Sequence, residues 1–308
     1  MKKPKAIIIC GPTASGKSGI ALELACKING AVINADSMQI YDALPIITAS
    51  PSFEDKQKAP HFLYNFLDPK KQYSVANFLQ DLEITLKECS AKNLVPIITG
   101  GTGMYINAAI CGVSKIPEID ISIRDKIAEL ALNEGIAHLY NLLKEIDPEI
   151  AEKLEPADTQ RIIRAYSVIK VTGKSILEYQ KTTSGSVLLN YDVTTIYLKP
   201  ERDFLYDTCN NRFESIVESG GLDEIKSMQN LDQLPILKAL GVRELKNYLE
   251  GQVLLEKAIE EAKAKTRQYA KRQTTWFNNQ ISWNHKAINY KNIDEYRDNK
   301  VAILDMFL

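Results

Sequence analysis

The stretch "GPTASGKS" at residues 11–18 matches the phosphate-binding loop pattern GxxxxGK[ST] and decides the fold class. It follows the short apolar run "AIIIC" (6–10) and opens "SGIALELACKING" (18–30), whose apolar residues recur at helical spacing. A strand, this loop and a helix in that order form the context that confirms the motif. Gly11 and Gly16 let the loop curl so that its N–H groups point inward, and the helix dipole favours an anion there.

The loop is a candidate diphosphate site in which every motif residue takes part. Lys17 can reach the terminal phosphates, and the Ser18 hydroxyl can ligate Mg²⁺, so we expect magnesium as a cofactor. The motif alone leaves open whether a phosphate is transferred or a diphosphate is held for another reaction. The candidate diphosphate-binding residues are Gly11, Pro12, Thr13, Ala14, Ser15, Gly16, Lys17 and Ser18.

Further strands and helices alternate along the first third of the chain. The apolar runs 31–35, 94–99 and 193–198 predict strands, and Ser74 is a candidate cap for a helix over 74–92. Repeated strand–helix units imply a parallel sheet with right-handed crossovers. We therefore predict an α/β fold, a parallel sheet of the phosphate-loop type flanked by helices.

The pattern changes near Lys115, after which helical periodicity continues with almost no strand signal. This predicts an all-helical insertion domain over 116–185, inside a catalytic core formed by 1–115 and 186–308 with C-terminal helices. The tail after Asn284 gives no clear pattern.

Composition limits the function further. The 308 residues carry a net charge of −1, so any site for a polyanion depends on local clusters of Lys and Arg. The five cysteines form no CxxC pair, which is typical of free thiols in a reducing cytosol. No segment approaches the roughly 18 apolar residues that a membrane span needs. We expect a cytoplasmic protein that does not contact membranes.

Asp36, in "INADSMQIY" (33–41), directly follows a predicted buried strand, which puts it beside the phosphate loop at the carboxyl edge of the sheet. Three interpretations remain open from the residues alone. Asp36 is a second-shell ligand to Mg²⁺, a general base, or an N-cap of the next helix.

Three more segments have a functional and a structural interpretation. The glycines of "TGGTGMYINA" (99–108) permit close approach to a ligand, or simply a tight turn. In "QRIIR" (160–164), Arg161 and Arg164 share a helix face that contacts a phosphate or only water. The segment 263–277, "KAKTRQYAKRQTTWF", interleaves five basic residues with Tyr, Trp and Phe; it binds RNA, or its aromatic residues pack inward.

Taken together, these stretches resemble the tRNA dimethylallyltransferases, also called tRNA isopentenyltransferases. The resemblance runs in family order from about residue 6 to residue 278. The matching stretches are "GPTASGKS", "INADSMQIY", "PHFLYNFLDP" (60–69), "GGTGMYINA", "DTQRIIRA", "LKALGVRE" (237–244) and "KRQTTWF".

The resemblance implies that the loop holds dimethylallyl diphosphate and that no ATP is used. The exocyclic N6 amine of the adenosine beside the tRNA anticodon (position 37) attacks the first prenyl carbon, and diphosphate leaves. Asp36 is then the base, Thr13 contacts the bridging oxygen, and Arg212 contacts the diphosphate. The implied partners are the tRNA anticodon stem-loop and dimethylallyl diphosphate, with the protein a monomer and the insertion contacting tRNA.

The tRNA contacts that the resemblance implies come from several segments. They are Asp36, Ser37, Met38, Gln39, Thr102, Arg124, Gln160, Arg161, Ile162, Ile163, Arg164, Lys238, Gly241, Arg243, Lys271, Arg272, Gln273 and Trp276.

The chain departs from the family pattern at two places. Thr208 stands where many bacterial members carry a second arginine, and 42–52 differs from the usual "IGTAKP" segment. The rival interpretations are a small-molecule kinase, a prenyltransferase acting on free adenylate, and an RNA-binding module without activity. The kinase interpretation does not explain the motif "KRQTTWF". A prenyltransferase that acts on free adenylate would have less need of the helical insertion. A module without activity does not explain Thr13 and Asp36 beside an intact loop.

Overall fold

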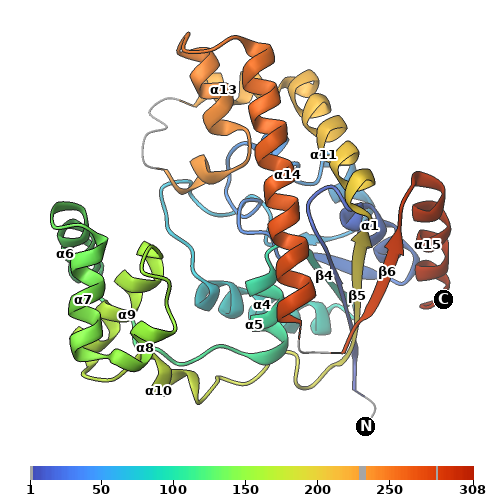
Figure 1. Cartoon of the computed structure of the whole chain (residues 1–308). Helices are drawn as coiled ribbons and strands as arrows, with labels where there is room; N and C mark the ends of the chain where they lie inside the picture. The colour runs from blue at the N-terminus through green and yellow to red at the C-terminus, as the bar shows by residue number, and fades with distance from the viewer. Residues whose placement is uncertain (1–2, 229–233, 282–283) are drawn as a thin grey trace. The chain divides into compact units, whose positions relative to one another are not determined.

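The computed structural model describes residues 3–228, 234–281 and 284–308, and the chain divides into two compact units. The core unit comprises Met1–Ile110 and Val187–Leu308, and the helical unit comprises Cys111–Ser186. The structural division therefore falls close to the predicted bounds of 116–185. In Figure 1 the labelled strands all belong to the core unit.

The core unit is built on a six-stranded sheet of order β3-β2-β4-β1-β5-β6, in which all neighbouring strands are parallel. The strands are β1 (Lys5–Cys10), β2 (Gly30–Asn34), β3 (His61–Phe62), β4 (Val95–Gly100), β5 (Asp192–Pro200) and β6 (Lys286–Tyr290). The register pairs Cys10 with Gly100 and Asn34 with Thr99. The carboxyl ends of β1, β2 and β4 are therefore level, and the segments that follow them share one edge of the sheet.

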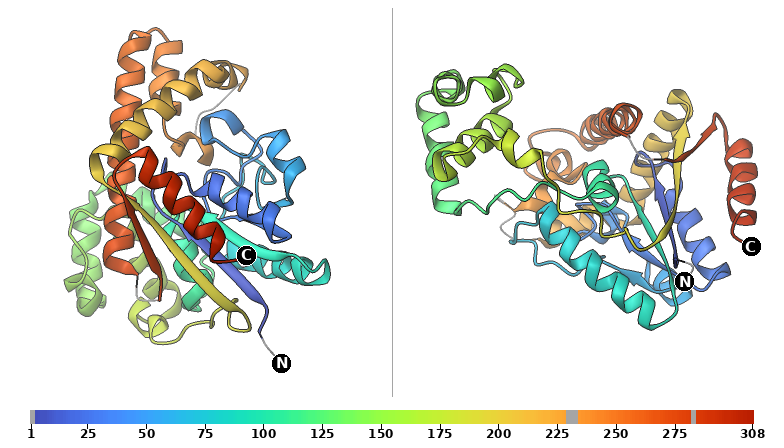
Figure 2. Two further views of the ribbon diagram at one scale, coloured as in Figure 1. Left: turned by 90° about the vertical axis from the view of Figure 1, so that its right-hand side faces the viewer. Right: turned by 90° about the horizontal axis from the view of Figure 1, so that it is seen from below.

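The predicted parallel sheet is confirmed, and four of its strands match the predicted runs. The short edge strands β3 and β6 were not predicted, and neither was the helix α15 (Ile293–Asp305) that follows β6. Figure 2 shows β6 and α15 at one edge of the core unit. The unpatterned tail is therefore ordered structure that extends the sheet.

Helices cover both faces of this sheet. α1 (Lys17–Lys27) and α15 pack on one face, where Ile7, Val32 and Ile196 belong to the same buried cluster as residues of both helices. Side chains alternate along a strand, so Tyr197 points to the opposite face, where its ring contacts that of Phe277 in α14 (Leu255–Gln280).

One of the remaining helices of the core unit begins at a residue with a clear local cause. At α4 (Val75–Ala91), Ser74 caps the helix and forms a capping box with Asn77, as the sequence predicted for Ser74. The other helices are α2 (Pro45–Thr48), α3 (Phe53–Lys58), α11 (Arg202–Ile216), α12 (Leu222–Ser227) and α13 (Val242–Leu249), with α5 (Gly103–Cys111) ending at the unit boundary.

The helical unit contains α6 (Ile121–Asn133), α7 (Ile136–Ile146), α8 (Pro148–Glu152), α9 (Thr159–Thr172) and α10 (Ile176–Gln180). Asp147 and Asp158 cap α8 and α9, and Gly173 ends α9 in the left-handed conformation, with φ of 70°. Leu139, Leu143 and Ile162 are fully buried in its own core. The predicted helical insertion is present as a unit with its own hydrophobic interior.

Two global expectations concern membranes and cysteines. Across the described parts of the chain, the helices are too short or too polar to cross a bilayer. All five cysteines are free thiols, and Cys10, Cys89 and Cys209 are buried.

Candidate active site

The phosphate loop joins β1 to α1 and curls as its sequence predicts. Gly16 adopts φ of 78°, a left-handed conformation that a larger residue would adopt only with strain. A side chain at Gly11 would collide with the Leu198 carbonyl of β5, so the loop lies close to the sheet. The Lys17 side chain is buried, and its Nζ donates to the Pro12 carbonyl at 2.9 Å.

A cavity of about 220 Å³ lies within this loop. Residues from the loop, from the ends of β2 and β4, and from α11 form its walls. They are Thr13, Ala14, Gly16, Lys17, Ser18, Gly19, Asp36, Gln39, Ala49, Thr99, Gly100 and Arg212. The structure thus brings together Thr13, Asp36 and Arg212, the three residues expected to be catalytic, with most of the expected diphosphate site.

The charged side chains that line the cavity are two cations, Lys17 and Arg212, and one anion, Asp36. Burial lowers the pKa of Lys17 to about 8, and the Arg212 charge lowers it too, while Asp36 acts in the opposite direction. Burial also lowers the pKa of Arg212, again opposed by Asp36. A buried lysine and a partly buried arginine facing a single carboxylate form a site that an anion would stabilise.

Asp36 lies two residues beyond β2 and is held by hydrogen bonds to Asn34 and Met38. Its Oδ1 accepts the Met38 N–H at 2.9 Å, and its own N–H donates to Asn34 Oδ1 at 2.8 Å. The segment after Asp36 is a turn and not a helix, so the N-cap interpretation is wrong. The carboxylate lines the cavity beside Lys17, a position compatible with both remaining interpretations, base and Mg²⁺ ligand.

The glycines of the turn after β4 leave space for side chains of α14. A side chain at Gly101 would overlap the Gln273 amide, and one at Gly103 would overlap the Trp276 ring. Both Gln273 and Trp276 belong to α14. The tight packing of this helix therefore accounts for these two glycines, whereas Gly100 borders both the cavity and the Ala35 backbone.

Gln273 connects this turn to the phosphate loop. Its Oε1 accepts the Thr13 N–H, and its Nε2 donates to the Gly101 carbonyl, both at 2.8 Å. The side chain is 6 % exposed. The geometry assigns Gln273 to the support of the loop and leaves its amide paired inside the protein, which corrects the expected tRNA contact.

Two other expected tRNA contacts are buried as well. Ile162 belongs to the core of the helical unit, and Gly241 is the N-cap of α13, where a side chain would overlap the Phe213 ring. Ile162 and Gln273 lie on the inward-facing sides of α9 and α14, whereas Gly241 precedes α13 in the left-handed conformation, against the Phe213 ring.

The remaining expected tRNA contacts are at least partly exposed. Ser37 donates its N–H to Thr102 Oγ1 at 3.0 Å, and Gln39 Nε2 donates to the Thr48 and Ala49 carbonyls. Those in the helical unit are Arg124, Gln160, Arg161, Ile163 and Arg164, and those of the core unit include Met38, Lys238 and Arg243. Burial, and secondarily the Arg124 charge, lowers the pKa of Arg164, so the two guanidinium groups lie within electrostatic reach.

The basic stripe of α14 separates into two parts. Lys263 is buried against Glu214 and Glu260, with Nζ–O distances of 2.6 and 2.8 Å, and Arg267 bonds Asn210. The contacts to Glu214 and Asn210 attach α14 to α11, so this part of the stripe is structural.

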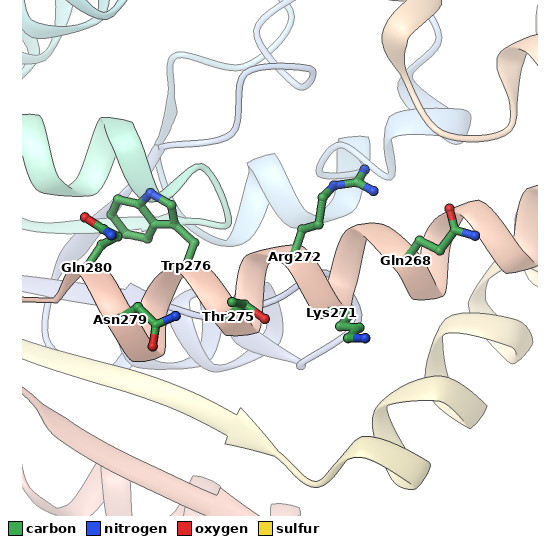
Figure 3. Close-up of a pocket in the computed structure, with 7 residues that line it drawn as sticks. All are labelled: Gln268, Lys271, Arg272, Thr275, Trp276, Asn279 and Gln280. Atoms are coloured by element: carbon green, nitrogen blue, oxygen red, sulfur yellow. The ribbon is translucent and has the colours of Figure 1, made fainter. Parts of the chain in front are cut away.

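The second part is an open hollow of about 610 Å³ on α14. It is lined by Gln268, Lys271, Arg272, Thr275, Trp276, Asn279 and Gln280. Figure 3 shows Gln268, Arg272, Trp276 and Gln280 along one side of the helix, which agrees with their spacing of four residues. We call this surface the α14 face. It combines two cations, an aromatic ring and several amides, as RNA-binding surfaces do.

Two contacts to the phosphate loop come from residues that the sequence did not indicate. Tyr290 donates its hydroxyl to the Ser15 carbonyl at 2.7 Å, and Tyr296 donates to the Gly16 carbonyl at 3.1 Å. No local pattern marks them, because their partners are more than 270 residues away.

A strand, a phosphate loop with a buried lysine, and a helix on a parallel sheet define a phosphate-loop α/β protein. Residues 39–280 match the model of the IPP transferase family. A tRNA dimethylallyltransferase of Rickettsia canadensis is 43% identical over 96% of this chain and 91% of its own length. The chain therefore belongs to the IPP transferase family.

Solved structures agree with this assignment. The tRNA isopentenylpyrophosphate transferase of Bacillus halodurans is 34% identical, with a TM-score of 0.66 over 99% of this chain and 98% of its own. A eukaryotic dimethylallyltransferase, captured acting on tRNA, is 27% identical, with a TM-score of 0.82 over 99% of this chain and 79% of its own.

Proposed function

We propose that this protein transfers a dimethylallyl group from dimethylallyl diphosphate to the N6 amine of the adenosine beside the tRNA anticodon. The observation that carries the proposal is the phosphate-loop cavity, where Lys17, Asp36 and Arg212 converge. The family assignment supports it, because relatives that match most of the chain are tRNA dimethylallyltransferases. We further propose that the protein acts as a monomer in the cytoplasm.

The diphosphate fits the loop for reasons of charge, because Lys17 and Arg212 both line the cavity. The N–H groups of the loop, Lys17 and Arg212 would stabilise the charge that grows on the leaving diphosphate. Thr13, at the cavity wall, would contact the bridging oxygen.

Asp36 would act as the general base. The bond between the prenyl carbon and the diphosphate oxygen breaks while the bond to N6 forms, and the amine then carries an extra proton. The Asp36 carboxylate is the only acidic side chain among the residues lining the described cavity, so it is the group placed to accept this proton.

Magnesium suits the oxygen donors of the same cavity. Ser18 offers a hydroxyl, and the buried Thr99 hydroxyl has no hydrogen-bond partner among the described residues. Hard cations such as Mg²⁺ prefer these oxygen ligands. A bound Mg²⁺ would neutralise charge on the departing diphosphate.

The tRNA would contact the α14 face. Trp276 offers a flat surface for an unstacked base, and Lys271 and Arg272 offer positive charge to the backbone. The target adenine must leave its stack before its amine reaches the prenyl carbon, so we expect base flipping. The exposed arginines of the helical unit would add contacts to the anticodon stem-loop.

One incubation tests the proposed reaction. Unmodified tRNA, Mg²⁺ and labelled dimethylallyl diphosphate are mixed without ATP, and label in RNA is measured together with free diphosphate. Equal amounts of both products support the proposal. Label on free adenylate but not on tRNA would point to an adenylate prenyltransferase. Phosphate transfer that requires ATP would point to a kinase.

A further inference from the structure

The segment formed by β6 and α15 contacts the phosphate loop directly, although it lies outside the residues matched by the family model. Tyr290 is the last residue of β6 and is 2 % exposed. Tyr296 lies in the first turns of α15. Their hydroxyls donate to two consecutive loop carbonyls, those of Ser15 and Gly16.

These two carbonyls determine the direction of two N–H groups. The Ser15 carbonyl shares a peptide plane with the Gly16 N–H, and the Gly16 carbonyl shares one with the Lys17 N–H. In a planar trans peptide the carbonyl and the N–H point in opposite directions. A hydroxyl that holds each carbonyl therefore also helps to fix the N–H on the other side of the plane. The Gly16 carbonyl accepts the Ile20 N–H of α1 as well, at 3.3 Å, so there the Tyr296 hydroxyl adds a second hydrogen bond. Gly16 and Lys17 both line the cavity.

The two tyrosines are themselves firmly held. The Tyr296 ring lies against Gly16, so closely that a side chain there would overlap it, and its centroid is 5.6 Å from that of Tyr290. Lys300 of α15 forms an ion pair of 2.8 Å with Glu23 of α1. Burial raises the pKa of both phenols, so both stay protonated and can donate.

We propose that Tyr290 and Tyr296 are positioning residues for the diphosphate, because they orient the Gly16 and Lys17 N–H groups toward it. The inference rests on the proposed diphosphate site. It makes the β6–α15 segment a functional part of the site. Pre-oriented donors need no rearrangement when the anion binds, and this is the form in which backbone dipoles stabilise charge most strongly.

The test removes only the hydroxyls, with the variants Tyr290→Phe and Tyr296→Phe. Tyr191→Phe is the matched control, because the Tyr191 hydroxyl also donates to a backbone carbonyl, that of Leu86, at 3.3 Å. Binding of inorganic pyrophosphate with Mg²⁺ is measured by calorimetry, and KM is measured separately for dimethylallyl diphosphate and for tRNA. Thermal unfolding of each variant shows whether it is folded.

We expect each loop variant to bind pyrophosphate roughly three- to tenfold more weakly, the factor for one lost hydrogen bond. The KM for dimethylallyl diphosphate should rise by a similar factor, while the KM for tRNA and both values in the control stay unchanged. Tyr296 is partly exposed, so its variant remains informative even if Tyr290→Phe fails to fold.

Three outcomes would overturn the inference, and they are distinguishable. If the parent protein binds pyrophosphate and both loop variants bind it equally well, the positioning role is wrong and the proposed function stands. If the parent protein binds neither pyrophosphate nor dimethylallyl diphosphate, the proposed function is wrong and this inference with it. A parallel rise in both KM values would indicate a general structural effect and would also overturn the positioning role.

Discussion

Replacing Gln273 with methionine tests whether α14 supports the phosphate loop from the side opposite α15. Methionine has a similar size but cannot bond the Thr13 N–H or the Gly101 carbonyl, which Gln273 contacts at 2.8 Å each. A buried polar group left without a partner costs about 1–3 kcal/mol. The Gly101 carbonyl bears this cost in full, whereas the partly buried Thr13 N–H regains some water.

The expected loss for Gln273→Met is therefore about 2–4 kcal/mol of the free energy of unfolding. At about 2–4 °C per kcal/mol for a domain of this size, Tm should fall by roughly 5–15 °C. Calorimetry measures it directly. Gln268→Met is the control for stability, because it makes the same chemical change on the exposed side of α14 and should leave Tm within about 2 °C of the parent.

The two interpretations of Gln273 predict opposite results. If Gln273 supports the loop, stability and diphosphate affinity fall together in Gln273→Met. If Gln273 contacts tRNA, Tm stays at the parent value and only tRNA affinity falls. A Tm equal to that of Gln268→Met would therefore refute the argument from burial and pairing.

Three further predictions concern the reaction and its substrates. Asp36→Asn should keep tRNA and pyrophosphate binding but lower turnover about 10²–10⁴-fold in single-turnover assays, and unchanged turnover would exclude Asp36 as the base. The lowered pKa of Lys17, about 8, arises from burial and from Arg212, so its ammonium group loses a proton as the pH rises through that value. Pyrophosphate affinity, measured by calorimetry, should fall between about pH 7 and about pH 9, and a flat or rising profile would contradict this assignment. Lys271→Gln should reduce the slope of log affinity for tRNA against log salt by about one, whereas an equal change in Lys265→Gln, outside the α14 face, would show that the face has no special role.

The part of the site that could be predicted from sequence is the part whose cause is local. The phosphate loop follows from glycines and a lysine at fixed spacing, and Asp36 follows from its place directly after a buried strand. Parallel strands then bring these segments to one edge without further information. Thr13, Lys17 and Asp36 therefore line one cavity, as their sequence context suggests.

The rest depends on contacts between distant segments, which spacing does not reveal. Lys263 counted as part of a basic stripe, but Glu214 of another helix neutralises it. Gln273 belongs to a motif that the resemblance linked to tRNA. It is buried because the turn after β4, at Gly101, packs against it. Strand β6 is a short edge strand with only Ile288 and Tyr290 buried, which is too little pattern to predict.

The departures from the family pattern also acquire a physical meaning. Thr208 stands where the resemblance led us to expect a second arginine, and its hydroxyl bonds the Phe204 and Leu205 carbonyls of its own helix, so it adds no charge to the cavity. Arg212 is then the arginine that lines the described cavity, together with Lys17. With Lys17 and Arg212 as the cations that line the described cavity, we expect the loop N–H groups to contribute to stabilising a diphosphate. Because Tyr290 and Tyr296 hold the carbonyls behind two of those groups, the loss of either hydroxyl should weaken diphosphate binding even though Lys17 and Arg212 remain.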